Sequence, residues 1–107
     1  MSTSNIKSTR LLDSVVATGA GTFYQVAPYR YFVFTCIATA VTTRGTMKVE
    51  AQDFENNTVT LATLTVSANG NQVVAVTGPY QNVRANLTAR TDGTYTCRMD
   101  AALAKGT

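Results

Sequence analysis

Residues 78–101, GPYQNVRANLTARTDGTYTCRMDA, carry the clearest secondary-structure signal in the chain. After an opening Gly-Pro turn, apolar and polar side chains alternate along residues 83–90 and again along residues 94–101. Such alternation is typical of strands that bury one face. The intervening Thr91-Asp92-Gly93 is typical of a three-residue turn that ends with a left-handed glycine. The stretch therefore predicts a hairpin of two half-buried strands.

The register of this hairpin follows from keeping its apolar residues on one face. A three-residue loop pairs Leu87 with Cys97, whereas a two-residue turn places Leu87 opposite Arg98. The longer loop also places Arg84 opposite Asp100, and such a cross-strand pair of opposite charges stabilises a sheet by about 0.2–1 kcal/mol. We therefore expect Arg84 to pair with a carboxylate of the same chain, so that its position requires no bound ligand.

The remaining sequence also favours short strands. A chain of 107 residues forms one domain, and its 19 threonines favour strands over helices. Asn69-Gly70 predicts a second hairpin that pairs Val66 with Val73, and a change of buried parity near Ala62-Thr63 predicts a bulge. We expect an all-β, two-layer β-sandwich of jelly-roll-like form with about eight short antiparallel strands, at residues 11–16, 22–26, 30–42, 47–52, 59–66, 73–77, 83–90 and 94–101.

The two halves of the chain resemble each other. Sliding the sequence along itself aligns Pro28-Tyr29 with Pro79-Tyr80, and other matches fall at predicted turns. We interpret this as an internal pseudo-repeat of one four-stranded unit, over residues 11–53 and 62–101. Unrelated hairpins also share Gly and Thr, which is the alternative explanation.

The N-terminal residues are expected to lie outside the sandwich. Residues 1–10 are polar around a single Ile6, so we predict a flexible N-terminal arm there and one β-sandwich domain over residues 11–107. The arm is either a frayed terminus or a segment that orders against a neighbouring subunit. In the second case Ile6 and Arg10 are candidate interface residues.

The residues needed for most catalysis are missing. The chain has no histidine and no CxxC pair, so it lacks the usual zinc and copper ligands and any Ser-His or Cys-His nucleophile system. Its six acidic residues form no visible general-acid pair. The loop at residues 53–57 could gather oxygens for calcium, but it lacks EF-hand spacing and suits a loop tip equally well. We expect no enzyme activity, no cofactor and no metal.

Charge and hydropathy limit which partners and which cellular compartment are expected for the chain. The net charge is +3 and the basic residues are scattered along the sequence, which gives little support for nucleic-acid binding. The outward Arg84, Arg90 and Arg98 could face phosphates, or they could face solvent or a neighbouring subunit. No segment approaches the roughly 20 apolar residues of a membrane span, and the N-terminus lacks a signal-peptide core. We expect synthesis in the cytoplasm, no membrane partner, and two reduced, buried cysteines in preference to a disulfide.

The longest apolar run offers a candidate interface. Within residues 30–42, both parities are apolar. If one parity faces the core, Tyr31, Val33 and Ile37 face outward and need a cover, because soluble monomers rarely expose large apolar patches. Either an oligomer covers them, or a bulge midway along the strand buries both sets in turn.

The motifs Pro79-Tyr80, VRANLTA, Asp92-Gly93-Thr94 and the final alternating strand resemble those of small virion β-sandwich proteins of tailed bacteriophages. That family includes head decoration or cement proteins and fibre-type modules, many of them symmetric trimers on the virion surface. The resemblance covers less than a quarter of the chain well. It implies a virion structural protein and supplies no catalytic residues.

The resemblance and the composition together lead to one expected function. We expect a capsid decoration or cement protein of a virion that binds the major capsid protein, or another virion protein, as a homo-oligomer, with a trimer as the expected form. The alternative is a carbohydrate-binding or adaptor module of a phage head fibre, tail or baseplate, in which the tyrosines stack on sugar. Tyr29 and Tyr80 equally suit a packing role at the corners of the sandwich.

Overall fold

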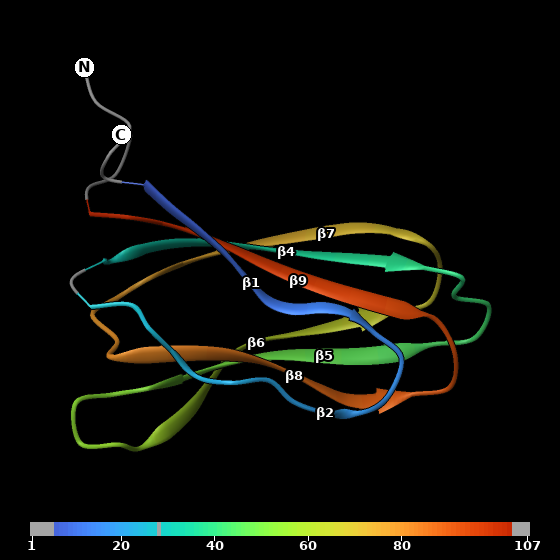
Figure 1. Ribbon diagram of the computed structural model, residues 1–107, viewed down its shortest axis with the longest axis horizontal. Coiled ribbons are helices and arrows are strands. Elements are labelled where there is room, and N and C mark those ends of the chain that lie inside the picture. The colour runs from blue at the N-terminus through green and yellow to red at the C-terminus, as the bar shows by residue number, and fades with distance from the viewer. Residues whose placement is uncertain (1–5, 28, 104–107) are drawn as a thin grey trace.

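The computed structural model describes residues 6–27 and 29–103, which form two antiparallel β-sheets packed face to face (Figure 1). These two ranges contain strands and no helix. The strands are β1 (Ile6–Val15), β2 (Gly19–Ala20), β3 (Tyr24–Gln25), β4 (Tyr31–Thr39), β5 (Gly45–Gln52), β6 (Thr58–Val66), β7 (Gly70–Thr77), β8 (Asn82–Arg90) and β9 (Thr94–Ala102).

The strand order is that of a jelly roll. The four-stranded sheet runs β1-β9-β4-β7, and the five-stranded sheet runs β2-β8-β5-β6 with β3 also paired to β8. Because β2 and β3 are two-residue segments that both pair with β8, they act as one interrupted strand. Eight strands divided between two layers in this order form a jelly roll. The predicted all-β, two-layer sandwich is therefore confirmed.

Alternate residues of the central strands fill the space between the sheets. β5 and β9 alternate between buried and more exposed side chains along almost their whole length. Full burial of one such apolar side chain contributes about 1.5–3 kcal/mol. The largest fully buried side chains are Tyr95, Phe32, Phe34, Met47, Leu87 and Met99.

The two predicted hairpins are wrong. β8 and β9 lie in different sheets, so the turn at residues 91–93 carries the chain across the sandwich (Figure 1). β6 and β7 likewise lie in different sheets. Val73 lies opposite Thr35 of β4, and not opposite Val66 as the hairpin predicted. The reason is that alternation tells which side chains face the core, and a hairpin and a crossing between sheets satisfy it equally well.

The pseudo-repeat has a structural counterpart that exchanges the sheets. The alignment of the two halves matches β1 with β6, the β2–β3 pair with β7, β4 with β8, and β5 with β9. Applying these matches to the order β1-β9-β4-β7 gives β6-β5-β8-β2, which is the order of the other sheet. The two halves of the chain therefore have the same topology, and each half contributes two strands to each sheet.

β4 is regular, so the alternative of a bulge midway along this strand is wrong. Its register with both β7 and β9 is continuous, and Phe32, Phe34, Cys36 and Ala38 all face the core. The inward-facing parity changes only after the strand, at Ala40, whose φ is 58°, although Thr35 on the outward parity is also buried. The bulge predicted in β6 is confirmed, because Leu61 is an extra residue between the paired positions Thr60 and Ala62.

The domain begins before residue 11. Ile6–Arg10 form the first half of β1 and pair with β9, from Ile6 opposite Ala102 to Arg10 opposite Arg98. The predicted arm is therefore wrong for residues 6–10, because an open edge of β9 was available for pairing. Residues 1–5 lie outside the described residues.

Candidate functional site

The outer surface of the four-stranded sheet carries an apolar area. Tyr31, Val33 and Ile37 point outward from β4, beside outward residues of β7. Val33 is 38% exposed and Val73 is 64% exposed. We call Tyr31, Val33, Ile37, Val73 and Ala75 the apolar face.

The neighbouring strands give this face a charged border. On β9, Asp100 lies opposite Val33, and Arg98 lies opposite Thr35. Arg98 Nε lies 3.6 Å from Asp100 Oδ2, and the Ser8 hydroxyl of β1 donates a hydrogen bond to Asp100 Oδ1. An apolar centre with a polar rim is the usual anatomy of a protein–protein contact surface.

The sequence-predicted interface residues are only partly brought together. Tyr31, Val33 and Ile37 share the apolar face. Arg10 lies two strands away on β1, where it pairs with the exposed Asp13 at 3.0 Å. Ile6 pairs with Ala102, and its side chain lies outside the described part of the structure.

Sequence reasoning missed Val73 and Ala75. The predicted hairpin paired Val73 with Val66 and so did not place Val73 beside residues 30–42. The available signal was the apolar run at residues 73–76, in which both parities are apolar. As in β4, one of the two parities had to face outward.

The outer surface of the five-stranded sheet is polar and internally bonded. Arg84 Nε donates to Glu50 Oε1 at 2.8 Å, and its guanidinium lies 4.3 Å from the centre of the Phe23 ring (a cation–π contact). The predicted pair with Asp100 is wrong, because β8 pairs with β5. Arg90 Nε donates to the Gly93 carbonyl at 2.9 Å. These arginines are held by the chain itself, which argues against a phosphate site here.

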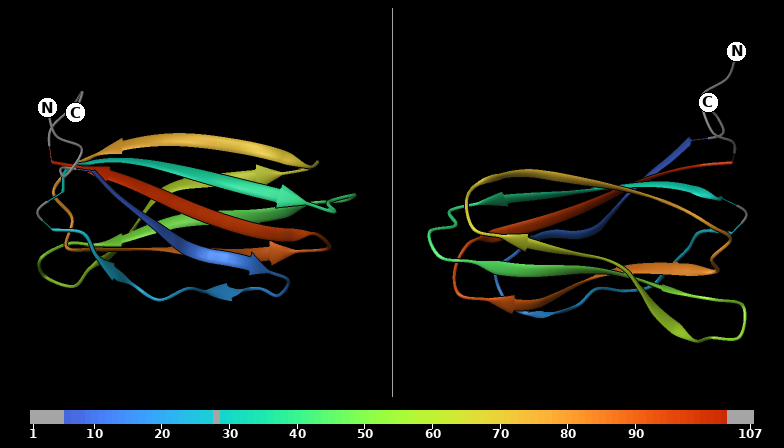
Figure 2. Two further views of the ribbon diagram at one scale, coloured as in Figure 1. Left: turned by 45° about the horizontal axis from the view of Figure 1, so that its top comes forward. Right: turned by 180° about the vertical axis from the view of Figure 1, so that it is seen from behind.

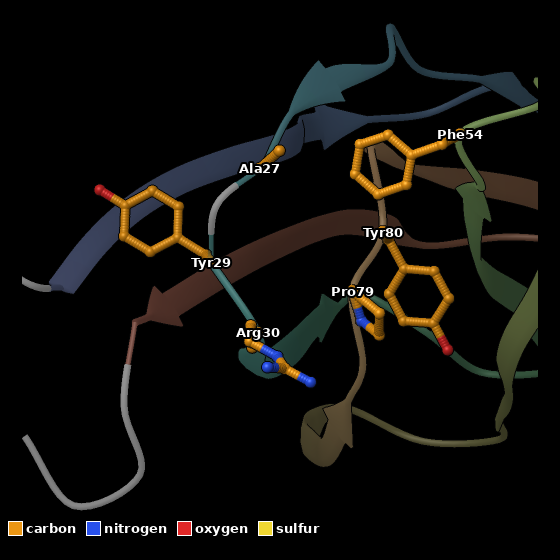
Figure 3. A pocket seen from close by; sticks show the side chains of 6 residues that line it. All are labelled: Ala27, Tyr29, Arg30, Phe54, Pro79 and Tyr80. Atoms are coloured by element: carbon orange, nitrogen blue, oxygen red, sulfur yellow. The ribbon is translucent and has the colours of Figure 1, made fainter.

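A pocket opens at one end of the sandwich (Figure 3). It has a volume of about 350 Å³ and is open to solvent. Tyr80 packs on the core residue Phe32, with ring centres 6.3 Å apart, while Phe54 above it is 62% exposed. Tyr29 points away from both rings (Figure 3). The lining residues are Ala27, Tyr29, Arg30, Phe54, Pro79 and Tyr80.

In the acidic loop at residues 53–57, considered above as a calcium site, hydrogen bonds from the loop itself occupy the Asp53 carboxylate. Asp53 Oδ1 accepts hydrogen bonds from the amides of Glu55, at 2.8 Å, and Asn57, at 3.0 Å. These backbone hydrogen bonds, that from Asn57 first, lower the pKa of Asp53. Across residues 6–27 and 29–103, no group of three or more His, Cys, Asp or Glu is placed to hold a metal ion. The loop is therefore explained as a turn.

Neither cysteine is placed for chemistry. Cys36 of β4 and Cys97 of β9 lie opposite each other with free, buried thiols. Burial raises the pKa of Cys36 to about 11. Burial, and to a smaller extent the nearby Cys36, raises the pKa of Cys97 to about 12. A thiol reacts as its thiolate, so both groups are poor nucleophiles.

The fold is similar to that of a prophage-derived protein. The chain matches the crystal structure of the SPBc2 prophage-derived protein YomS with a TM-score of 0.62 and 16% identity, over 91% of this chain and 93% of that chain. A second similar structure, from Bacillus endospore appendages that form disulfide-linked pili, has a TM-score of 0.49 and 14% identity, over 94% and 90% of the two chains. No protein-family model matches the chain, and no curated protein matches it in sequence.

These regions differ in how far contacts within the chain account for their exposed side chains. The structure shares the architecture of YomS, and at this identity the likeness concerns the fold alone. None of the described segments is a helix with the length and hydropathy required to span a bilayer. The apolar face combines exposed apolar side chains of two adjacent strands, β4 and β7, with a charged border on β9.

Proposed function

We propose that this chain is a non-enzymatic structural protein of a bacteriophage virion, and that it decorates or cements the head by binding the major capsid protein as a homo-oligomer. The observation that carries the proposal is the apolar face, with Val33 38% and Val73 64% exposed at its centre. Exposed apolar patches of this kind mark contact surfaces with other proteins.

The fold and the resemblance of the final strands support a place in a virion. The jelly roll is common among capsid proteins. YomS, whose fold the chain shares, comes from a prophage. The charged border of β9 and β1 supplies the polar rim that such a contact needs.

Binding to purified particles tests the proposal. Capsids of the phage that encodes the chain are mixed with the protein and sedimented, and the bound fraction is measured against protein concentration. Val33→Asp and Ile37→Asp each place a charge on the apolar face, so we expect at least about tenfold weaker binding, equal to about 1.4 kcal/mol. Thr63→Asp, at an exposed position on β6 of the other sheet and opposite Lys48, is the matched control and should bind normally.

A second candidate function rests on the end pocket. Phe54 is 62% exposed beside Tyr80, and exposed aromatic rings stack on sugars. If the chain is a carbohydrate-binding or fibre-adaptor module, the wild type should bind at least one glycan on an array. The Phe54→Ala variant should lose that glycan binding. A blank array combined with retained capsid binding would favour the decoration protein.

A further inference from the structure

One side of the sandwich carries no charged side chain. Between Glu55 and Arg84 the sequence contains no Asp, Glu, Lys or Arg. This stretch includes the whole of β6 and β7, the last strands of their respective sheets (Figure 2). Edge strands expose unpaired backbone groups, and natural proteins usually protect them with charges, bulges or proline. The lack of charge on both strands is therefore unusual.

Other edges in the described ranges are protected. β1 has register shifts between Arg10 and Val15, and its Ser14 has a φ of 53°. β2 and β3 are only two residues each. On β6, Leu61 is a bulge, and the Gln72 side chain donates to the Thr65 carbonyl at 2.9 Å. These features oppose the addition of a further strand.

β7 differs from all of them. Its eight residues pair with β4 without any register shift. Beyond its end, the Gly78 amide donates to the Arg30 carbonyl at 2.8 Å, which shows that Gly78 faces β4. Because backbone direction alternates along an antiparallel strand, the amides and carbonyls of Asn71, Val73, Ala75 and Thr77 face the open edge. β7 thus presents a regular, uncharged edge.

We propose that a second copy of this chain pairs with β7, antiparallel and across a two-fold axis at Val74. In this register Val73 lies opposite Ala75 of the second copy and Asn71 lies opposite Thr77, so every edge-facing group of these residues finds a partner. Facing residues point to the same side of the sheet, as a continuous sheet requires. The four-stranded sheets of two copies then form one eight-stranded sheet.

The lack of charge is what favours a second copy over another partner. The chain has a net charge of +3, and two identical basic molecules repel each other unless they meet where neither carries charge. A strand with the same edge on both copies is self-complementary, as a two-fold contact must be. An acidic partner would find nothing on β7 to recognise.

The pairing also enlarges the apolar face. Val73 and Ala75 of both copies meet at the axis, so the apolar faces of the two copies become one surface. This inference rests on the homo-oligomer in the proposed function but not on the capsid as partner. It gives a stoichiometry of two, whereas the phage resemblance implies three.

The mass of the protein in solution, measured by light scattering across a wide range of concentration, is the first test. We expect a dimer. Ala75→Pro removes an edge-facing amide while keeping an apolar side chain, so it should give a folded monomer. Val33→Asp changes the apolar face away from the edge, so it should remain dimeric while losing capsid binding. A wild-type monomer or trimer, or a folded Ala75→Pro dimer, would overturn the proposed pairing.

Amide hydrogen exchange tests the same contact without a substitution. The amides of Val73 and Ala75 should be protected in concentrated protein and should exchange faster on dilution. The amide of Gly78, which is bonded within the chain, is the internal control and should respond less. Concentration-independent exchange at Val73 and Ala75 would contradict pairing at β7, even if Ala75→Pro fails to fold. Loss of capsid binding with an intact dimer would instead concern the proposed function alone.

Discussion

The ring of Tyr95 lies directly against the backbone of Gly45, where a Cβ would overlap the tyrosine hydroxyl. Tyr95 belongs to β9 and Gly45 begins β5, so the contact joins the two sheets at one end of the sandwich. The Tyr95 hydroxyl also donates to the Asp92 carbonyl at 2.9 Å. The ring therefore fixes the turn before β9 as well as the start of β5.

Gly45→Ala should destabilise the protein strongly. The added methyl group has no free space, because the Tyr95 ring is fully buried and cannot move away without opening the core. Overpacking of this kind costs about 1–3 kcal/mol or more. Urea unfolding should show the loss as a lower midpoint. Tyr95→Phe, which keeps the ring and loses one hydrogen bond, is the matched comparison and should cost only about 0.5–1.5 kcal/mol.

Arg84 should be energetically coupled to Glu50 and not to Asp100. The Arg84–Glu50 pair is only partly exposed, and Phe23 packs beside the guanidinium, so we expect a coupling of about 1 kcal/mol. A double-mutant cycle with Arg84→Ala and Glu50→Gln, followed by urea unfolding, measures it. The parallel cycle with Asp100→Asn is the control. Coupling to Asp100 in place of Glu50 would mean that β8 and β9 form a hairpin after all.

This pair shows what sequence alone could and could not predict. Alternation placed Leu87 and Cys97 in the core and Arg84 on the outer surface, and each of these assignments is confirmed. It could not choose the partner of a strand, because β8 has the same inner and outer faces whether it pairs with β9 or with β5. That choice depends on residues far apart in the chain.

The candidate site divides in the same way. Tyr31, Val33 and Ile37 could be predicted to lie on one face because both parities of their strand are apolar. Val73 could not, since its position beside Thr35 requires knowledge that β7 crosses to the other sheet. The repeat was visible in the turns, but its exchange of the two sheets follows only from the pairing order.

Asp92 should contribute stability that is lost in acid. Its carboxylate accepts hydrogen bonds from the Thr42 hydroxyl and from the amides of Thr42 and Thr43. These hydrogen bonds, led by that of the Thr42 hydroxyl, lower its pKa below the usual 3.8. A lowered pKa in the folded state means that the stabilisation is complete above about pH 4 and falls as the pH drops through the folded value.

Asp92→Asn should therefore flatten the acid limb of the stability curve. Urea midpoints measured between about pH 2 and pH 5 should fall less steeply with decreasing pH in this variant than in the wild type. Asp53→Asn tests the other self-bonded loop, where the lowered pKa has the same direction. Equal slopes in wild type and Asp92→Asn would show that the Thr42 contact does not persist in solution.

Cys36 and Cys97 should resist thiol reagents while the protein is folded. With a pKa of about 11 for Cys36 and about 12 for Cys97, at most roughly one thousandth of either thiol is ionised near pH 8, and both are buried. Labelling with an aromatic disulfide reagent should therefore be slow, and it should accelerate only as urea unfolds the chain. Ser67→Cys, at an exposed position between β6 and β7, provides a thiol that should react rapidly in the folded protein. Rapid labelling of wild type in the absence of urea would mean that β4 and β9 separate readily, which the continuous register between them argues against.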